Sequence, residues 1–156
     1  MFRNAIKIFF IAACICVFLY TNTYAFEETV TIPAENADGV VLELEEGEYI
    51  CEYAGGAITL FYPINPNYCW LIGAAVGIEA EGGQDYPDVG TIYFDPDPPA
   101  ASQYEAEAQA TQAAKEGTIG TFFDFSLAEK TKVRFWVSDY DYTDNSGMIK
   151  LKISSI

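Results

Sequence analysis

The stretch GVVLELEEGEYICEY, residues 39–53, shows the alternation of apolar and polar residues most clearly. In residues 42–45 leucine alternates with glutamate, so the apolar side chains point to one side of an extended chain and the acidic side chains to the other. After a glycine the alternation resumes, with Tyr49, Cys51 and Tyr53 on one face. A period of two residues is typical of a strand with one buried and one exposed face. The stretch therefore predicts two half-buried β-strands.

Similar segments follow along the chain, separated by glycine and proline. Gly55-Gly56 is expected to end one strand before the next begins. Further strands are predicted at residues 57–62, 68–78, 90–94, 121–126, 132–137 and 148–156. In the last of these, the alternation predicts that Ile149, Leu151 and Ile153 face the core.

One segment departs from the strand pattern. Residues 100–116 (AASQYEAEAQATQAAKE) are rich in Ala, Gln and Glu, follow a pair of prolines and end before Gly117, which predicts a helix. We find no long linker and no internal repeat after residue 25, so we expect a single domain over residues 26–156. The expected fold is all-β: an antiparallel β-sandwich of jelly-roll or galactose-binding-domain-like type with one short helical insertion.

Residues 1–25 have the form of an export signal. Arg3 and Lys7 precede an apolar run of 13 residues, Ile8–Tyr20, which is too short to span a membrane. Thr23-Tyr24-Ala25 presents small residues for cleavage after Ala25. We therefore expect a secreted, extracellular or periplasmic protein with no membrane insertion after cleavage. Cys14 follows a lipobox-like tripeptide, so lipidation of this cysteine is the open alternative.

Charge and composition exclude several classes of function. Residues 26–156 hold all 23 acidic residues and six of the eight basic ones, a formal net charge of −17. A field of this sign repels nucleic acid and anionic membranes and attracts cations. The chain contains no histidine, which excludes imidazole bases, histidine-dependent triads and His-ligated zinc or copper.

Two cysteines remain after the signal, Cys51 and Cys69. An even pair in an exported protein predicts a disulfide. The alternative is two free thiols buried in apolar strands.

The loop Asp139–Gly147 (DYDYTDNSG) concentrates oxygen ligands before the last strand. Asp139, Asp141 and Asp144 supply carboxylates and Asn145 an amide oxygen, the donor set that calcium prefers. The alternative is a polar hairpin whose Asp and Asn side chains bond to their own turn.

The residues around this loop resemble the C-terminal signature of the calcium-dependent galactose-binding bacterial lectins. The resemblance rests on FFDFSL at 122–127, VRFWVSD at 133–139, DNSG at 144–147 and the apolar strand that follows. Upstream, residues 39–53 are similar to that family's early strand pair, and Tyr62-Pro63 to its first calcium loop. The specific part of this resemblance covers about thirty-five residues.

The resemblance implies a bacterial origin and a ligand set for one calcium ion. Asp139, Asp144 and Asn145 correspond to side-chain ligands, Asp141 to a main-chain carbonyl ligand, and Tyr62 to a further carbonyl from the first loop. In that family the sugar hydroxyls complete the coordination of the ion. The histidine and glutamine that grip galactose there have no visible counterpart in this chain.

Aromatic residues near the two loops are candidate sugar contacts, because the C–H face of a sugar packs well on such rings. The candidates are Tyr62, Tyr68, Trp70, Tyr140 and Tyr142. Catalysis is not expected, since the acids lie in one loop rather than on opposite walls of a cleft. We expect a secreted calcium-binding, lectin-like module for carbohydrate, with a galactose-type sugar as the candidate ligand. The alternative is a non-catalytic structural or protein-interaction domain of the extracellular or cell-surface space, with a calcium-rigidified or metal-free loop.

Overall fold

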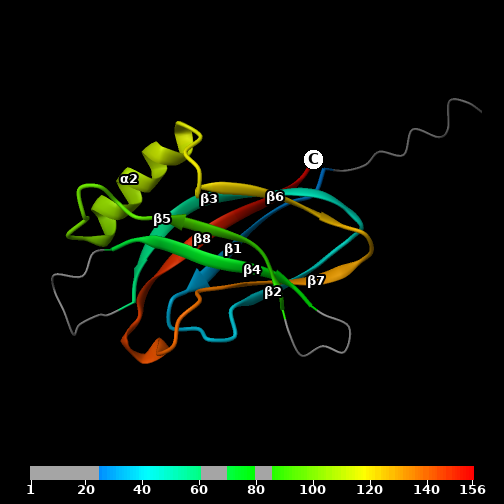
Figure 1. The fold of residues 1–156 in the computed structure, drawn as a ribbon, viewed down its shortest axis with the longest axis horizontal. Helices are drawn as coiled ribbons and strands as arrows, with labels where there is room; N and C mark the ends of the chain where they lie inside the picture. The colour runs from blue at the N-terminus through cyan, green and yellow to red at the C-terminus, as the bar shows by residue number, and fades with distance from the viewer. Residues whose placement is uncertain (1–24, 61–69, 80–85) are drawn as a thin grey trace, which may run out of the picture.

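The computed structural model describes residues 25–60, 70–79 and 86–156 (Figure 1). The predicted export signal before residue 25 and the candidate residues Tyr62, Tyr68 and Cys69 lie outside these ranges. No helix in the described ranges is long and apolar enough to cross a membrane.

Within these ranges, eight strands form two four-stranded antiparallel sheets. The first sheet has the order β1-β8-β3-β6, from β1 (Glu27–Pro33), β8 (Ser146–Ser155), β3 (Gly47–Thr59) and β6 (Phe122–Leu127). The second has the order β2-β7-β4-β5, from β2 (Val40–Leu44), β7 (Thr131–Trp136), β4 (Ile72–Ile78) and β5 (Asp88–Phe94). Together with the one α-helix of the described ranges, this arrangement confirms the predicted β-sandwich (Figure 1).

The core lies between the two sheets and follows the alternation of the sequence. In β8 the predicted inward residues Ile149, Leu151 and Ile153 are all fully buried. From the other sheet, Val133 and Phe135 of β7 are also fully buried and belong to the same cluster. Burying each such side chain contributes roughly 1.5–3 kcal/mol, which makes this shared face the main stabilising element of the sandwich.

The glycine pair that we expected to separate two strands lies inside one strand instead. β3 runs through Gly55 and Gly56, and its register with β8 shifts between Tyr53 and Gly55, which marks a β-bulge. Gly56 has φ +80, and a Cβ there would lie 2.2 Å from the carbonyl oxygen of Met148. Glycine therefore permits the close approach of β8 at the bulge and does not end the strand.

The helix α2 (Gln103–Lys115) lies within the segment predicted to be helical. The Ser102 side chain caps it by accepting a hydrogen bond from the N–H of Glu105. Its buried residues Ala106, Ala110 and Ala113 are four and three positions apart, so small side chains share the face that packs on the sandwich. Glu107 fixes the contact with the bulge, because its Oε1 accepts a 2.9 Å hydrogen bond from the N–H of Gly56.

Contrary to the sequence-based expectation, Cys51 does not form a disulfide. Its thiol is free and fully buried on the inward face of β3. Burial raises the pKa of Cys51 to about 12, with a smaller contribution from the charge of Glu52, so the thiol is held protonated and unreactive. Cys51 therefore acts as a small apolar core residue.

Candidate functional site

The acid-rich loop connects β7 to β8 and contains one turn of 3-10 helix, η1 (Tyr142–Asp144). Asp141 caps this turn: its Oδ1 accepts hydrogen bonds from the Thr143 hydroxyl (2.6 Å) and from the Thr143 N–H (3.0 Å). These two bonds hold the pKa of the Asp141 carboxyl below its ordinary value. The Asp141 side chain is exposed and shapes the loop by local bonding.

Tyr142 ties the loop to the end of β7. Its hydroxyl donates a 2.6 Å hydrogen bond to the carbonyl of Val137 and accepts one of 3.4 Å from the N–H of Asp139. The other aromatic candidate in the loop, Tyr140, is fully exposed. The two tyrosines therefore differ in role, since Tyr142 supports the loop and Tyr140 is open to solvent.

Asn145 is the most buried residue of the loop, with 4% of its surface exposed. Its Nδ2 donates a 3.0 Å hydrogen bond to the carbonyl of Ala34, at the end of β1. Ala34 in turn donates its N–H to the carbonyl of Gly147 at 3.0 Å. Gly147 has φ +94, and a Cβ there would lie 2.3 Å from the carbonyl oxygen of Ala57. Glycine is therefore required at position 147. Hydrogen bonds to Ala34 hold the turn at both Asn145 and Gly147.

Three buried side-chain oxygens of the loop have no hydrogen-bond partner. They are Oδ2 of Asp139, Oδ1 of Asp144 and Oδ1 of Asn145. In the described ranges only one other buried side-chain polar atom, the hydroxyl of Ser154, is in this state. A buried polar atom without a partner costs about 1–3 kcal/mol, and more when it is charged. All three loop oxygens are acceptors, so only a donor or a cation can satisfy them.

The loop groups fewer carboxylates than the sequence suggested. In the described part of the chain, no cluster of three or more His, Cys, Asp or Glu residues could hold a metal ion. The unpartnered set consists of two carboxylates and one amide, because the Asp141 side chain is engaged with Thr143. Trp70, the other described candidate, is half-buried, and its ring lies against Gly147, where a Cβ would be 2.8 Å from the ring atom Cζ3.

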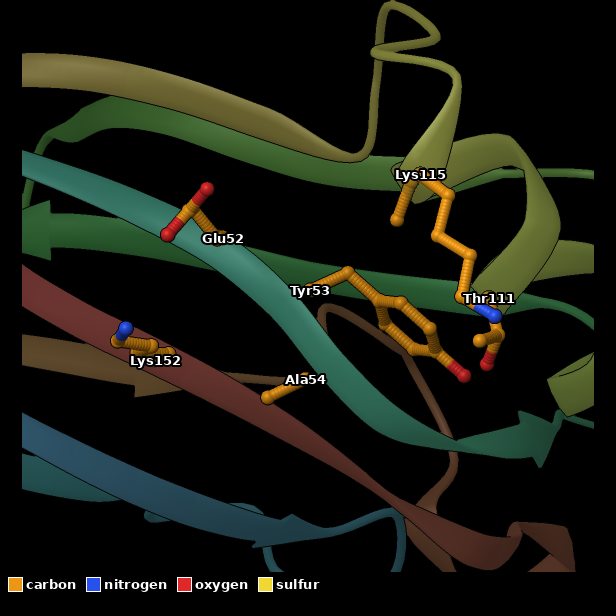
Figure 2. A pocket seen from close by; sticks show the side chains of 7 residues that line it. Glu52, Tyr53, Ala54, Thr111, Lys115 and Lys152 are labelled. Carbon is orange, nitrogen blue, oxygen red and sulfur yellow. The ribbon is translucent and has the colours of Figure 1, made fainter.

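A separate groove lies between α2 and the first sheet (Figure 2). It has a volume of about 320 Å³, and its lining includes Glu52, Tyr53, Thr111, Lys115 and Lys152. The Tyr53 hydroxyl donates a 2.7 Å hydrogen bond to the carbonyl of Gly56, and burial raises its pKa to about 12. None of the site residues proposed from sequence lies in this groove.

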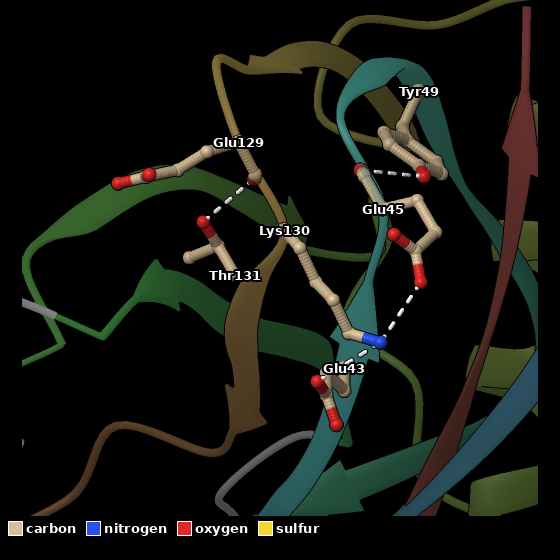
Figure 3. Close-up of polar contacts among 6 residues, drawn as sticks. All are labelled: Glu43, Glu45, Tyr49, Glu129, Lys130 and Thr131. Atoms are coloured by element: carbon tan, nitrogen blue, oxygen red, sulfur yellow. Dashed lines mark hydrogen bonds and ion pairs between the residues drawn. The ribbon is translucent and has the colours of Figure 1, made fainter.

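At the end of the sandwich remote from the loop, acidic residues of β2 and of the turn after it are partly neutralised (Figure 3). Lys130, in the turn between β6 and β7, places its Nζ 2.9 Å from Oε1 of Glu45 and 3.1 Å from Oε1 of Glu43. Hydrogen bonds to Glu45 and Glu43 raise the pKa of Lys130. All three side chains are exposed, so the contacts contribute little to stability and this end has the character of a solvated surface.

No family model matches the sequence, and no curated protein matches it. Among solved structures, a chain described as "EclA N-terminal domain; PllA-like lectin" is similar with 14% sequence identity and a TM-score of 0.47. The match covers 82% of this chain and 95% of that chain.

Proposed function

We propose that the protein binds one calcium ion through Asp139, Asp144 and Asn145 and uses this site to bind carbohydrate as a lectin-like module. The observation that carries the proposal is the set of three buried oxygens without partners, one from each of these side chains. The same three residues are the side-chain ligands implied by the resemblance of the loop to galactose-binding lectins. Burial and residue identity thus support the same ligand set.

The chemistry of the donor set fits a hard cation. Calcium takes about six to eight oxygen ligands at flexible distances, from carboxylates, amides, main-chain carbonyls and water. The three loop atoms are all oxygens, and the chain has no histidine to favour zinc or copper. The formal net charge of −15 for the whole chain further favours cation binding.

Two of the three ligand residues, Asn145 and Asp139, are held in place by other residues of the chain. Asn145 is oriented by its bond to Ala34, which leaves its Oδ1 available. Asp139 is fixed through its Oδ1, which accepts a 2.6 Å hydrogen bond from the N–H of Tyr140 and leaves Oδ2 without a partner. A bound calcium ion would supply open coordination positions for two hydroxyls of a sugar. The exposed ring of Tyr140 offers an apolar surface beside them.

Export of the protein would be consistent with calcium-dependent binding of carbohydrate. With residues 1–25 removed on export, the site would meet extracellular calcium, for which dissociation constants of roughly 10⁻⁴–10⁻³ M are sufficient. We propose a neutral galactose-type sugar as the ligand, on the basis of the resemblance.

A second candidate function is structural. Asn145 and Gly147 both bond to Ala34, so the loop already joins β8 to the end of β1. A cation there would rigidify this junction without contacting a glycan. The protein would then serve as a scaffold or a protein-interaction domain.

Calorimetric titration with calcium, followed by glycan binding with and without chelator, tests the proposal. Asp144→Ala should abolish the calcium heat, whereas Asp124→Ala, which removes one exposed carboxylate from the outer face of β6, should retain it. Glycan binding that chelator abolishes supports the lectin. A chelator effect on melting temperature without glycan binding supports the structural role. If calcium at millimolar concentration produces no heat of binding, both the calcium-dependent lectin and the calcium-rigidified structural domain are ruled out.

A further inference from the structure

A groove on the second sheet begins directly beside the proposed site. It has a volume of about 180 Å³ and is lined by residues of β4 and β5 together with Val137 and Ser138, and by the apolar side chains of Ile58 from β3, Leu60 and Leu71. Ser138 is the residue immediately before Asp139. The Val137 carbonyl accepts the hydrogen bond from Tyr142, so Val137 both lines the groove and anchors the loop.

The groove exists because the middle strand carries small side chains. Gly73 and Ala75 lie on the face of β4 opposite to the core residues Ile72 and Val76. Their neighbours across β5 are larger: Tyr93 pairs with Gly73, and Thr91 pairs with Ala75. A strand of small residues beside larger ones leaves a shallow depression along the sheet.

Tyr93 forms a fixed aromatic wall of this depression. A Cβ at Gly73 would lie 3.4 Å from Cδ2 of Tyr93, so one side of the ring rests on the glycine. The backbone N–H of Tyr93 donates a 2.8 Å hydrogen bond to the carbonyl of Gly120. The side chain is nevertheless 52% exposed. An aromatic ring held on a strand and open to solvent suits the apolar face of a sugar ring.

We infer that this groove binds the second ring of an uncharged oligosaccharide whose first ring lies at the proposed calcium site; the inference rests on the function proposed above. Cavities for whole ligands usually measure about 300–1,000 Å³, so a groove of 180 Å³ fits a single ring of a longer ligand. The hydroxyls of Thr91 and Ser138 can both donate and accept hydrogen bonds to sugar hydroxyls.

The charge of the groove selects the class of oligosaccharide. Among the described residues that line it, Asp88 is the only acidic or basic one. A bound calcium ion would offset the charges of Asp139 and Asp144, so the negative field at the groove comes from Asp88 and from the formal net charge of −15 of the whole chain. Sialylated, sulfated or uronate-containing glycans would be repelled. The ligand is therefore neutral at the second position.

Titration calorimetry in millimolar calcium with methyl β-galactoside, lactose and sialyllactose tests this inference. We expect lactose to bind more tightly than the monosaccharide and sialyllactose more weakly than lactose. Tyr93→Ala should weaken lactose binding roughly 3- to 10-fold, the loss expected for one aromatic contact. The same variant should leave calcium and methyl β-galactoside binding unchanged, and Tyr93→Phe should retain the affinity for lactose. Tyr104→Ala, at an exposed tyrosine of α2, is the matched control.

The outcomes separate the two proposals. If calcium and methyl β-galactoside bind but lactose binds no more tightly, or if Tyr93→Ala affects both sugars equally, the groove is not a second-ring site while the calcium lectin stands. If sialyllactose binds more tightly than lactose, the assignment to neutral glycans is wrong. If neither calcium nor any sugar binds, the proposed function fails and this inference fails with it.

Discussion

The side-chain amide of Asn145 donates a hydrogen bond to the carbonyl of Ala34, a residue 111 positions earlier in the chain. The donor and the acceptor are 3.0 Å apart, and the contact is buried. This bond fixes which side of the amide faces the end of β1, and it leaves Oδ1 as an acceptor without a partner. The conformation of the loop between β7 and β8 therefore depends on a contact with Ala34, near the other end of the sequence.

Replacing Asn145 should destabilise the fold even without metal. Asn145→Asp keeps the size of the side chain but cannot donate to Ala34, so the buried carbonyl loses its partner at a cost of about 1–3 kcal/mol. Denaturant unfolding in chelator would measure this loss. Millimolar calcium should restore part of it, because the new carboxylate is a better calcium ligand. A variant as stable as the wild type in chelator would contradict the role assigned to the bond.

Calcium itself should raise stability through the loop. With a dissociation constant in the extracellular range, 10 mM calcium should add about 1.4–2.7 kcal/mol to the free energy of unfolding. Asp144→Ala should lose this gain. In chelator the same variant should be no less stable than the wild type, because it removes a buried oxygen that has no partner. Parallel melting curves in calcium and in chelator test both statements, and an equal calcium response of the variant would refute the first.

Gly147 should tolerate no side chain. Gly147→Ala combines a left-handed backbone with a Cβ 2.3 Å from the carbonyl oxygen of Ala57, and we expect a loss of roughly 3–4 kcal/mol. Gly117→Ala is the control, since its φ is +67 but no atom lies within 4 Å of the added carbon. That variant should lose only about 1–2 kcal/mol. Equal losses in denaturant unfolding would show that the close approach to Ala57 is unimportant.

Stability should fall at alkaline pH. Burial raises the pKa values of both Cys51 and Tyr53 to about 12, with smaller contributions from Glu52 and Glu107 respectively. The unfolded chain releases these protons at lower pH than the native state does, so stability is fully present below roughly pH 9 and is lost as pH rises toward 12.

Tyr53→Phe tests the tyrosine part of this dependence. The variant should lose about 1 kcal/mol at neutral pH, because the hydroxyl no longer bonds to Gly56, and should show a shallower alkaline decline. Tyr104→Phe, at a side chain that is 81% exposed, should follow the wild type at every pH. If Tyr53→Phe declines as steeply as the wild type between pH 9 and 11, the buried hydroxyl is not a source of the effect.

The sequence determined the strands whose pattern is local. Alternation placed Ile149, Leu151 and Ile153 in the core, and the alanine-rich composition identified α2, because side-chain periodicity within one segment decides which face can be buried. The strand β1 was missed, although Val30 and Ile32 alternate with threonine and are buried there. The pattern is short, and its pairing with β8 joins opposite ends of the chain.

The burial of the individual loop side chains became clear only from the three-dimensional structure. Composition and resemblance both identified Asp139, Asp144 and Asn145 as side-chain ligands. Composition alone added the carboxylate of Asp141, whereas the resemblance assigned that position a main-chain carbonyl. Folding separated them: Asp141 bonds to Thr143 at the surface, whereas the other three each bury one oxygen without a partner. Likewise, Cys51 was assigned to a disulfide until its position in the core left it a free thiol. Burial in an irregular loop depends on segments far apart in the chain that meet in space, so the strand periodicity that predicted the core could not assign it.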